Sequence, residues 1–225
     1  MSAGERKGPV VLVTQVGAAG GSSAAAAALA CAASESDRAA LLVDVGEGRA
    51  PRATLVATTG ARAMEERLAA HLPDAAIASR GRICELRISP GPEALATLAA
   101  ALPLSRETAA VVHLTPSLLR AAIAEPHIRP TAALLRADLV EDRALTALVG
   151  RDLIARGLRV AVLKRPLDWL TARAAGLGAL PPGAGGLSPR LRERLLDVED
   201  KKLQQCYDEG DGDEPEETQV GWGRP

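Results

Sequence analysis

Short apolar runs alternate with longer stretches of helical spacing along most of this chain. The first run, 9–14, is rich in valine, is followed by a glycine-rich loop and predicts a buried strand. Further strand-like runs occupy 39–45, 83–88, 109–114, 131–136 and 158–163. Helical stretches occupy 24–33, 61–71, 92–102, 117–124 and 142–156. Repeated strand–helix units need right-handed crossovers, so the pattern predicts an α/β fold, doubly wound, with a mostly parallel sheet and helices on both faces.

The pattern also predicts one main domain with short extensions. Residues 1–8 are polar and are expected to form a flexible N-terminus, whereas 9–190 form the α/β domain. A further helix is expected at 189–205, because Ser188 and Pro189 suit its N-cap and first position. Residues 206–225 are acidic and rich in glycine and proline, which predicts disorder. The apolar stripe of the 142–156 helix is expected to comprise Leu145, Leu148, Val149, Leu153 and Ile154.

Composition makes the core aliphatic and divides the charge unevenly. The 225 residues are 47% hydrophobic but 1% aromatic, with no phenylalanine. Residues 198–225 carry nine acidic and three basic side chains, which leaves 19 acidic and 24 basic in 1–197. The body is therefore about +5 and the acidic segment about −6. The basic residues are scattered and lack aromatic neighbours for base stacking, so no nucleic-acid partner is expected.

The cysteines and histidines give no sign of a metal site or a disulfide framework. Cys31, Cys84 and Cys206 lie far apart without a CxxC pair, and the three histidines lack metal spacing. Cys31 and Cys84 lie in apolar elements and are expected in the core. No signal peptide and no run as long as a membrane span is recognised, so we expect a cytoplasmic protein without membrane insertion.

A glycine-rich loop follows the first predicted strand and precedes the first predicted helix. The stretch 15–23 reads Gln-Val-Gly-Ala-Ala-Gly-Gly-Ser-Ser, and Ser22 is expected near the helix N-cap. Ligands in open α/β sheets bind at the carboxyl ends of the strands. Backbone N–H groups and a helix N-terminus at that place form an anion site.

The loop resembles the deviant Walker A loop of the ParA/MinD family of P-loop ATPases, whose pattern is K-G-G-x-G-K-[ST]-[ST]. Gly17 and Gly20 match glycines of that pattern, and Ser22 and Ser23 match its paired hydroxyl residues. The family's signature lysine falls at Val16 and its P-loop lysine at Gly21, so both lysines are absent. Because phosphoryl transfer depends on positive charge at the phosphates, we expect weak binding through Gly17, Gly20, Gly21, Ser22 and Ser23, without efficient hydrolysis.

Two further stretches resemble the family's Mg²⁺-supporting motifs. Asp44 matches the first carboxylate of the second-strand D-x-D motif and is the one candidate catalytic residue, whereas Gly46 replaces the second carboxylate. His113 occupies the position of the Walker B aspartate, so the carboxylate that supports Mg²⁺ is missing. No metal site is therefore expected.

The resemblance continues in order over roughly 9–190. Arg165 matches, and Lys164 replaces, the Asn-Arg pair that contacts adenine in the family, and 173–181 resembles its closing turn. The resemblance implies a P-loop-NTPase-like domain that binds ATP or ADP weakly and acts as a positioning or scaffold partner. Degenerate members of the CpaE/TadZ type imply secretion or pilus machinery as the partner, and a homodimer is the family's usual working unit.

Alternative functions stay open at this point. One is an active MinD/ParA-like ATPase whose site is rescued by a cation from elsewhere in the chain. Another is a Rossmann-type NAD(P)-binding oxidoreductase, with Asp44 on a ribose hydroxyl, although the glycine spacing is not G-x-G-x-x-G. A third is a pure interaction module for nucleic acid or a secretion apparatus.

Each site residue also has a purely structural interpretation. The glycine loop fits an ordinary turn between a strand and a helix, and Asp44 fits a cap of the following loop. His113 fits a hydrogen-bonded core or strand-end residue, and Lys164 and Arg165 fit solvation of the sheet edge.

Overall fold

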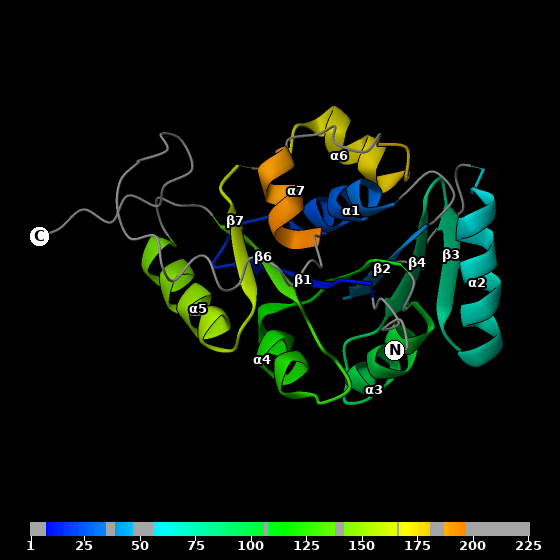
Figure 1. The fold of residues 1–225 in the computed structure, drawn as a ribbon, viewed down its shortest axis with the longest axis horizontal. Coiled ribbons are helices and arrows are strands. Elements are labelled where there is room, and N and C mark those ends of the chain that lie inside the picture. Colours follow the sequence, from blue (N-terminus) through cyan, green and yellow to red (C-terminus); the bar gives the residue numbers. More distant parts are fainter. Residues whose placement is uncertain are drawn as a thin grey trace, which may run out of the picture.

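A seven-stranded sheet forms the centre of the protein (Figure 1). The computed structural model describes residues 8–34, 39–46, 56–105, 108–137, 142–165, 167–180 and 187–196. The strands are β1 (Val10–Val16), β2 (Ala40–Val45), β3 (Ala76–Arg80), β4 (Ile83–Ile88), β5 (Ala110–His113), β6 (Ala132–Ala137) and β7 (Arg159–Leu163). Their order is β3-β4-β2-β5-β1-β6-β7, and only the β3–β4 pair is antiparallel. The predicted α/β class with a mostly parallel sheet is confirmed.

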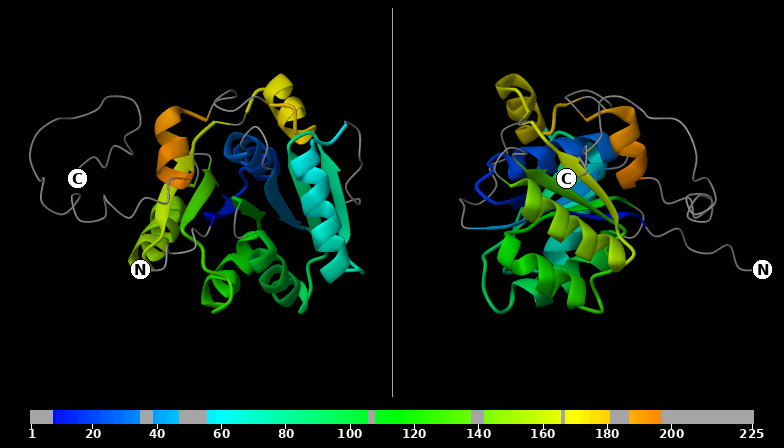
Figure 2. Two further views of the ribbon diagram at one scale, coloured as in Figure 1. Left: turned by 45° about the vertical axis from the view of Figure 1, so that its right-hand side comes forward. Right: turned by 90° about the vertical axis from the view of Figure 1, so that its left-hand side faces the viewer.

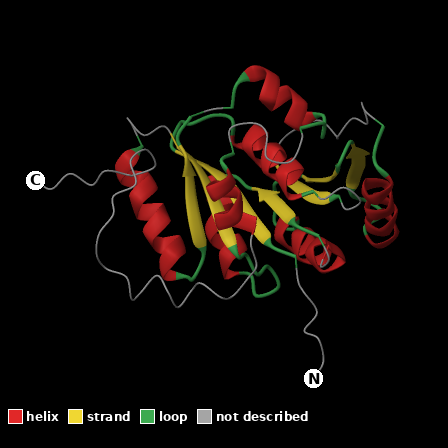
Figure 3. Ribbon diagram, turned by 45° about the horizontal axis from the view of Figure 1, so that its top comes forward, coloured by secondary structure: helices red, strands yellow, loops and turns green. Residues whose placement is uncertain are grey.

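Helices cover both faces of the sheet (Figures 1 and 3). They are α1 (Ser22–Ala33), α2 (Thr59–His71), α3 (Ala94–Ala101), α4 (Pro116–Ala124), α5 (Arg143–Ala155), α6 (Trp169–Gly176) and α7 (Pro189–Leu196), with a 3-10 turn at Leu102–Ser105. One core cluster joins the sheet to α2, α3, α4 and α5, and a second joins its other face to α1, α6 and α7. No helix in the described part of the chain is long and apolar enough to cross a membrane.

Helix α1 is enclosed on every side. Every residue from Ala25 to Ala32 is buried, because the sheet lies on one side of α1 and α6 and α7 lie on the others (Figure 2). A helix that is buried all round cannot be amphipathic. Its alanines are small enough to let the helix lie close to the strands, which brings its N-terminus to the strand ends.

The chain reverses its direction across the sheet beside β1. The crossover through α1 leads from β1 to β2, whereas the crossover through α4 leads from β5 to β6 in the opposite direction and on the opposite face. The carboxyl ends of β1 and β5 are therefore a topological switch point, the place where open α/β sheets form a ligand crevice.

Three details differ from the sequence prediction. Strand β3 and helix α6 were not predicted, and Ser22 is the first residue of α1, with Gly21 as its N-cap. Helix α7 is described to Leu196, so the rest of the predicted 189–205 helix, the 206–225 segment and residues 1–7 lie outside the described residues.

The predicted apolar stripe of α5 is wrong in part. Leu153 is buried and Val149 packs against the core, but Leu145, Leu148 and Ile154 are exposed. The helix instead buries Thr146 and Gly150 along with Leu153. The face of α5 that meets the sheet is therefore rotated away from the leucine stripe.

Candidate functional site

Three polar side chains, one from each of three neighbouring strands, form a row on the face of the sheet that α1 covers. The register pairs Asp44 of β2 with His113 of β5 on one side and with Arg87 of β4 on the other. Their neighbours along each strand point into the core on the opposite face. The row lies at the carboxyl ends of these strands, so it reaches the switch point beside the glycine loop.

His113 lies between Ser22 and Asp44 and is hydrogen-bonded to both. Its Nε2 is 2.8 Å from Ser22 Oγ, and its Nδ1 is 2.7 Å from Asp44 Oδ1. This is the strand-end, hydrogen-bonded histidine of the structural interpretation, but it also joins two of the predicted site residues.

Ser22, His113 and Asp44 form a chain of two hydrogen bonds, which we call the relay. The charge of Asp44 determines which atoms of the relay carry the protons. Burial acts to raise the pKa of Asp44 and is the largest single influence. The hydrogen bond and charge of His113, and then the charges of Arg87 and Arg80, together outweigh burial and lower that pKa below its ordinary value of 3.8. Ionised Asp44 can only accept, so His113 Nδ1 carries the proton between them. In the neutral ring Nε2 then accepts the hydroxyl proton of Ser22.

A chain of alternating charges continues from Asp44 towards β3. Arg87 Nη2 lies 2.9 Å from Asp44 Oδ2 and 2.8 Å from Glu85 Oε1. Glu85 is 1% exposed and also forms an ion pair with Arg80. A carboxylate is tolerated at this buried position because two guanidinium groups flank it. Both oxygens of Asp44 are thus engaged with residues of the neighbouring strands.

The polar row forms the floor of a small cavity. The cavity has a volume of about 250 Å³ and is lined by Asp44, Arg87 and His113 from the sheet, with Ser23 of α1 and Ala172 of α6 opposite. Drug-sized ligands occupy about 300–1,000 Å³. The cavity therefore suits a phosphate-sized group or several water molecules rather than a whole nucleotide.

Two glycines hold α6 over this cavity. Gly178, just after α6, has φ +68° and lies so close to the β3–β4 turn that a Cβ there would be 2.2 Å from the Arg80 carbonyl oxygen. Gly81, in the turn, has φ +51° and would place a Cβ 2.3 Å from the Gly178 oxygen. Arg82 N donates to that same oxygen at 3.1 Å. The backbone contact is possible only because both residues lack a side chain.

The glycine loop connects β1 to α1 at this end of the sheet, as predicted. Gly21 is the N-cap of α1 and has no side chain to cap it, the first turn of α1 contains no acidic residue, and a Cβ at Gly20 or Gly21 would meet no described atom within 4 Å. A helix N-terminus of this kind suits an anion. Gly21 has φ +85°, a conformation that favours glycine, so a lysine at this position would be strained.

A carboxylate lies against the other end of the loop. A Cβ on Gly17 would be 1.9 Å from Asp142 Oδ1, and Gly17 has φ +63°. Asp142 Oδ2 is buried and has no hydrogen-bond partner among the described residues. The negative charge of Asp142 opposes a phosphate in the loop.

Asp142→Asn is expected to tighten the binding of pyrophosphate to the full chain by about fivefold. The reason is that a like-charge interaction near a protein surface is worth about 1 kcal/mol or more at contact distances. Isothermal titration at low ionic strength measures the change. Asp152→Asn is the matched control, because Asp152 is an exposed carboxylate of α5 that pairs with Arg156. An equal gain in both variants would show only a general effect of net charge.

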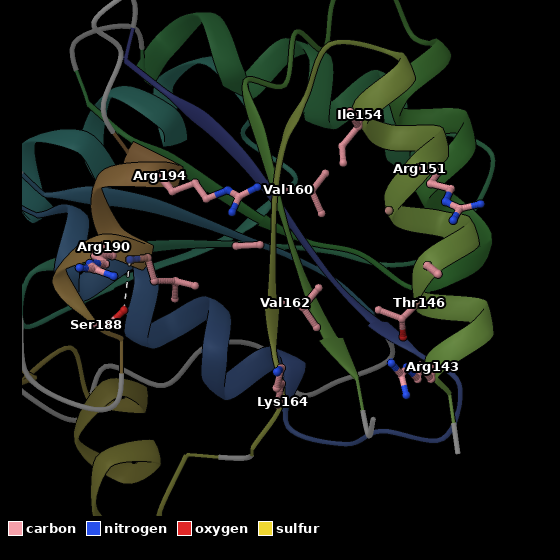
Figure 4. A pocket seen from close by; sticks show the side chains of 14 residues that line it. Arg143, Thr146, Arg151, Ile154, Val160, Val162, Lys164, Ser188, Arg190 and Arg194 are labelled. Carbon is pink, nitrogen blue, oxygen red and sulfur yellow. Dashed lines mark hydrogen bonds between the residues drawn. The ribbon is translucent and has the colours of Figure 1, made fainter. Parts of the chain in front are cut away.

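The structure does not bring Lys164 and Arg165 to the polar row. They follow β7, which is two strand spacings, about 10 Å, from β1. Lys164 lines a separate groove at the β7 edge (Figure 4). Between them and β1 lies the buried Arg136, whose Nη1 donates to the carbonyl oxygens of Ala137, Leu163 and Lys164 at 2.6, 3.3 and 3.2 Å.

Sequence reasoning missed Glu85, Arg87 and Arg80. Strand β4 reads Ile-Cys-Glu-Leu-Arg-Ile, in which charged residues alternate with apolar ones inside the sheet. Charges on one face of an interior strand indicate a buried polar network, so the signal was present for Glu85 and Arg87. Asp142 offers no such signal, because its place beside Gly17 follows from tertiary structure alone.

No protein-family model matches the sequence. No curated protein matches it either. Function must therefore be inferred from the residues and their geometry.

Proposed function

We propose that this chain is a ParA/MinD-like protein that does not hydrolyse nucleotide efficiently and that acts as a positioning or scaffold partner. The observation that carries the proposal is the position of His113 between Ser22 and Asp44. In the family resemblance, Ser22 is the hydroxyl that meets Mg²⁺ and Asp44 is the retained carboxylate. Mg²⁺ needs ligands at about 2.0–2.1 Å in octahedral geometry, and an imidazole ring fills the space between these two residues.

The surroundings of the glycine loop support the same conclusion. Gly21 stands where the P-loop lysine belongs, and its left-handed backbone disfavours a lysine. The carboxylate of Asp142 adds negative charge where phosphate would need positive charge. Phosphoryl transfer rests on positioning and on charge stabilisation, so the loop is suited at most to weak binding of ATP or ADP.

Exposed apolar side chains support a role in binding a protein partner. Leu145 and Leu148 of α5 are 46% and 63% exposed, and Trp169 and Leu170 of α6 are 66% and 69% exposed. Within each helix the two side chains are neighbours, one turn apart on α5 and adjacent in α6, and apolar groups that gather on a surface can mark a contact with another protein. Secretion or pilus machinery as that partner, a homodimer as the working unit and a cytoplasmic location come from the family resemblance and belong to the same proposal.

The test is titration of the full chain with ATP, with and without Mg²⁺, together with a phosphate-release assay. We expect no turnover, and no gain in ATP affinity when Mg²⁺ is added. In His113→Ala the space between Ser22 and Asp44 opens, so ATP affinity should become dependent on Mg²⁺. Thermal melting checks that the variant is folded.

Ser22→Ala and Ser117→Ala form the matched pair for this test. Ser117 is an exposed residue of α4 and bonds to Thr115, so its loss should change nothing. Turnover in the wild-type chain that Ser22→Ala abolishes and Ser117→Ala preserves would overturn the proposal.

The relay itself favours a second candidate, a serine hydrolase. In such enzymes a histidine accepts the serine proton through Nε2 and is oriented by an aspartate at Nδ1, and Ser22, His113 and Asp44 have these contacts. The backbone N–H groups of the first turn of α1 would serve as oxyanion donors. Against this candidate, Ser22 is only 4% exposed, which restricts the approach of an acyl substrate.

A fluorophosphonate probe separates the two candidates. The ATPase-like proposal expects no covalent labelling. Labelling that is lost in Ser22→Ala and in His113→Ala, but kept in Ser117→Ala, would establish the hydrolase instead.

The other enzymatic alternatives have less support. For an oxidoreductase, Asp44 would have to bind a ribose hydroxyl, but its two oxygens bind His113 and Arg87. For a rescued ATPase, a cation would have to reach the loop, but Nη1 of Arg136 binds backbone carbonyls and Lys164 lines the separate groove.

A further inference from the structure

A groove runs along the outer edge of β7, between α5 and α7 (Figure 4). Its volume is about 570 Å³. In the described part of the chain β7 pairs only with β6, so its other edge is open. Val160, Ala161 and Val162 all line the groove although their side chains alternate between the two sheet faces. The strand edge is therefore its floor, and such an edge is suited to an extended peptide.

The walls of the groove carry charge of one sign. Its basic lining residues are Arg143 and Arg151 of α5, Lys164 after β7, and Arg190 and Arg194 of α7. None of the described lining residues is acidic. Apolar side chains from all three elements lie between these cations, so the groove combines an apolar floor with a basic rim.

We propose that this groove is a docking surface for an extended acidic peptide, and that its occupant is the chain's own segment 208–217. That segment reads Asp-Glu-Gly-Asp-Gly-Asp-Glu-Pro-Glu-Glu, with seven carboxylates and no basic residue. Its charge is complementary to the five basic residues of the groove. The inference is independent of the function proposed above.

The position of α7 beside the groove allows segment 208–217 to reach it. Ser188 Oγ accepts a hydrogen bond from Leu191 N at 3.2 Å, which fixes the first turn of α7 beside the groove. Helix α7 is described to Leu196, two residues after Arg194. Eleven residues, 197–207, separate Leu196 from the acidic segment. Eleven residues cover about 16 Å even as a helix and at most about 36–40 Å when extended, and the five residues of β7 extend over roughly 16 Å.

Tethering favours this segment over a free competitor. A segment on a short flexible linker has an effective concentration on the order of millimolar at its site. Even a weak intrinsic affinity then keeps the groove largely occupied. A free acidic peptide must displace the segment, so its apparent affinity for the whole protein is reduced.

The experiment measures the binding of a fluorescein-labelled decaglutamate by fluorescence anisotropy at low ionic strength. It compares the full chain with a full-length variant in which the seven carboxylates of 208–217 become amides (Asp→Asn, Glu→Gln). We expect the amide variant to bind decaglutamate about tenfold more tightly or more, because the tethered competitor is lost. The gain should shrink as salt is added.

Two pairs of substitutions in the amide variant locate the binding site. Arg190→Gln with Arg194→Gln should remove the gain. Arg120→Gln with Arg129→Gln removes the same charge from exposed positions outside the groove and should preserve it. Equal loss in both pairs would show non-specific attraction and overturn the proposal.

Methyl NMR gives a second readout on the unlabelled protein. The Val160 and Ile154 methyl signals should differ between the full chain and the amide variant, and the difference should not depend on protein concentration. Identical signals, or equal decaglutamate affinity of the two proteins, would show that the segment does not occupy the groove. A difference that grows with concentration would assign the occupant to a second copy and equally overturn the proposal.

Discussion

Glu85→Gln is expected to lower the free energy of unfolding by about 3 kcal/mol. Glu85 is 1% exposed and contacts both Arg80 and Arg87. Glutamine keeps the shape but removes the charge, so the ion pairs of Glu85 with two half-buried guanidinium groups are lost. Removing one partner of a buried ion pair typically costs about 3–5 kcal/mol, and the partial exposure of the arginines places this case at the lower end. Urea unfolding measures the change as a shift in midpoint at constant m.

Glu66→Gln is the matched control for this prediction. Glu66 is an exposed residue of α2, and surface substitutions usually change stability by less than about 0.5 kcal/mol. Equal effects of the two substitutions would mean that the network of Arg80, Glu85 and Arg87 adds nothing specific to the fold.

Gly178→Ala is expected to lower the free energy of unfolding by about 2–4 kcal/mol. Alanine would be strained at φ +68°, and its Cβ would lie 2.2 Å from a backbone oxygen that cannot rotate away. A strained backbone costs about 1–3 kcal/mol by itself, and the clash must in addition push α6 away from the β3–β4 turn. Thermal or urea unfolding measures the loss.

Gly176→Ala is the control for this prediction, because it makes the same glycine-to-alanine change at a position where a Cβ has room. Gly176 ends α6, and a Cβ there would meet nothing within 4 Å. Alanine at a compatible position stabilises by about 0.4–1 kcal/mol. A loss in Gly176→Ala as large as that in Gly178→Ala would contradict the proposed contact.

The parallel part of the fold could be predicted from the sequence because interior strands are apolar on both faces. Strands β1, β2, β5, β6 and β7 each appear as a compact apolar run, β4 keeps four apolar residues around Glu85 and Arg87, and the helices between the strands have helical spacing. Prediction of the element types needed only this local information.

The elements that were missed lie where the local signal is weak. Strand β3 is an edge strand of alanine, isoleucine, serine and arginine, and it is mostly half-buried. Helix α6 has eight residues, of which only Ala175 is buried. Its one local signal was Asp168, which caps the helix by accepting from Thr171 N at 2.9 Å.

The candidate site could be predicted only in part. Ser22 and Asp44 were recognised from their positions after the first and second strands. The bond that joins them through His113 depends on β5 lying between β1 and β2. Chain order places β5 after β4, so the local pattern alone did not predict the contact, although the family resemblance had placed His113 at a Mg²⁺-supporting position.

The enclosure of α1 sets a limit on how this sequence can diverge. Its alanines are surrounded by the sheet, α6 and α7, so drift at these positions is confined to side chains of nearly the same volume. A bulkier residue would lift the helix from the strands and carry Ser22 away from His113. A run of alanines, which appears interchangeable in the printed sequence, is thus a stretch that tolerates little change in side-chain volume.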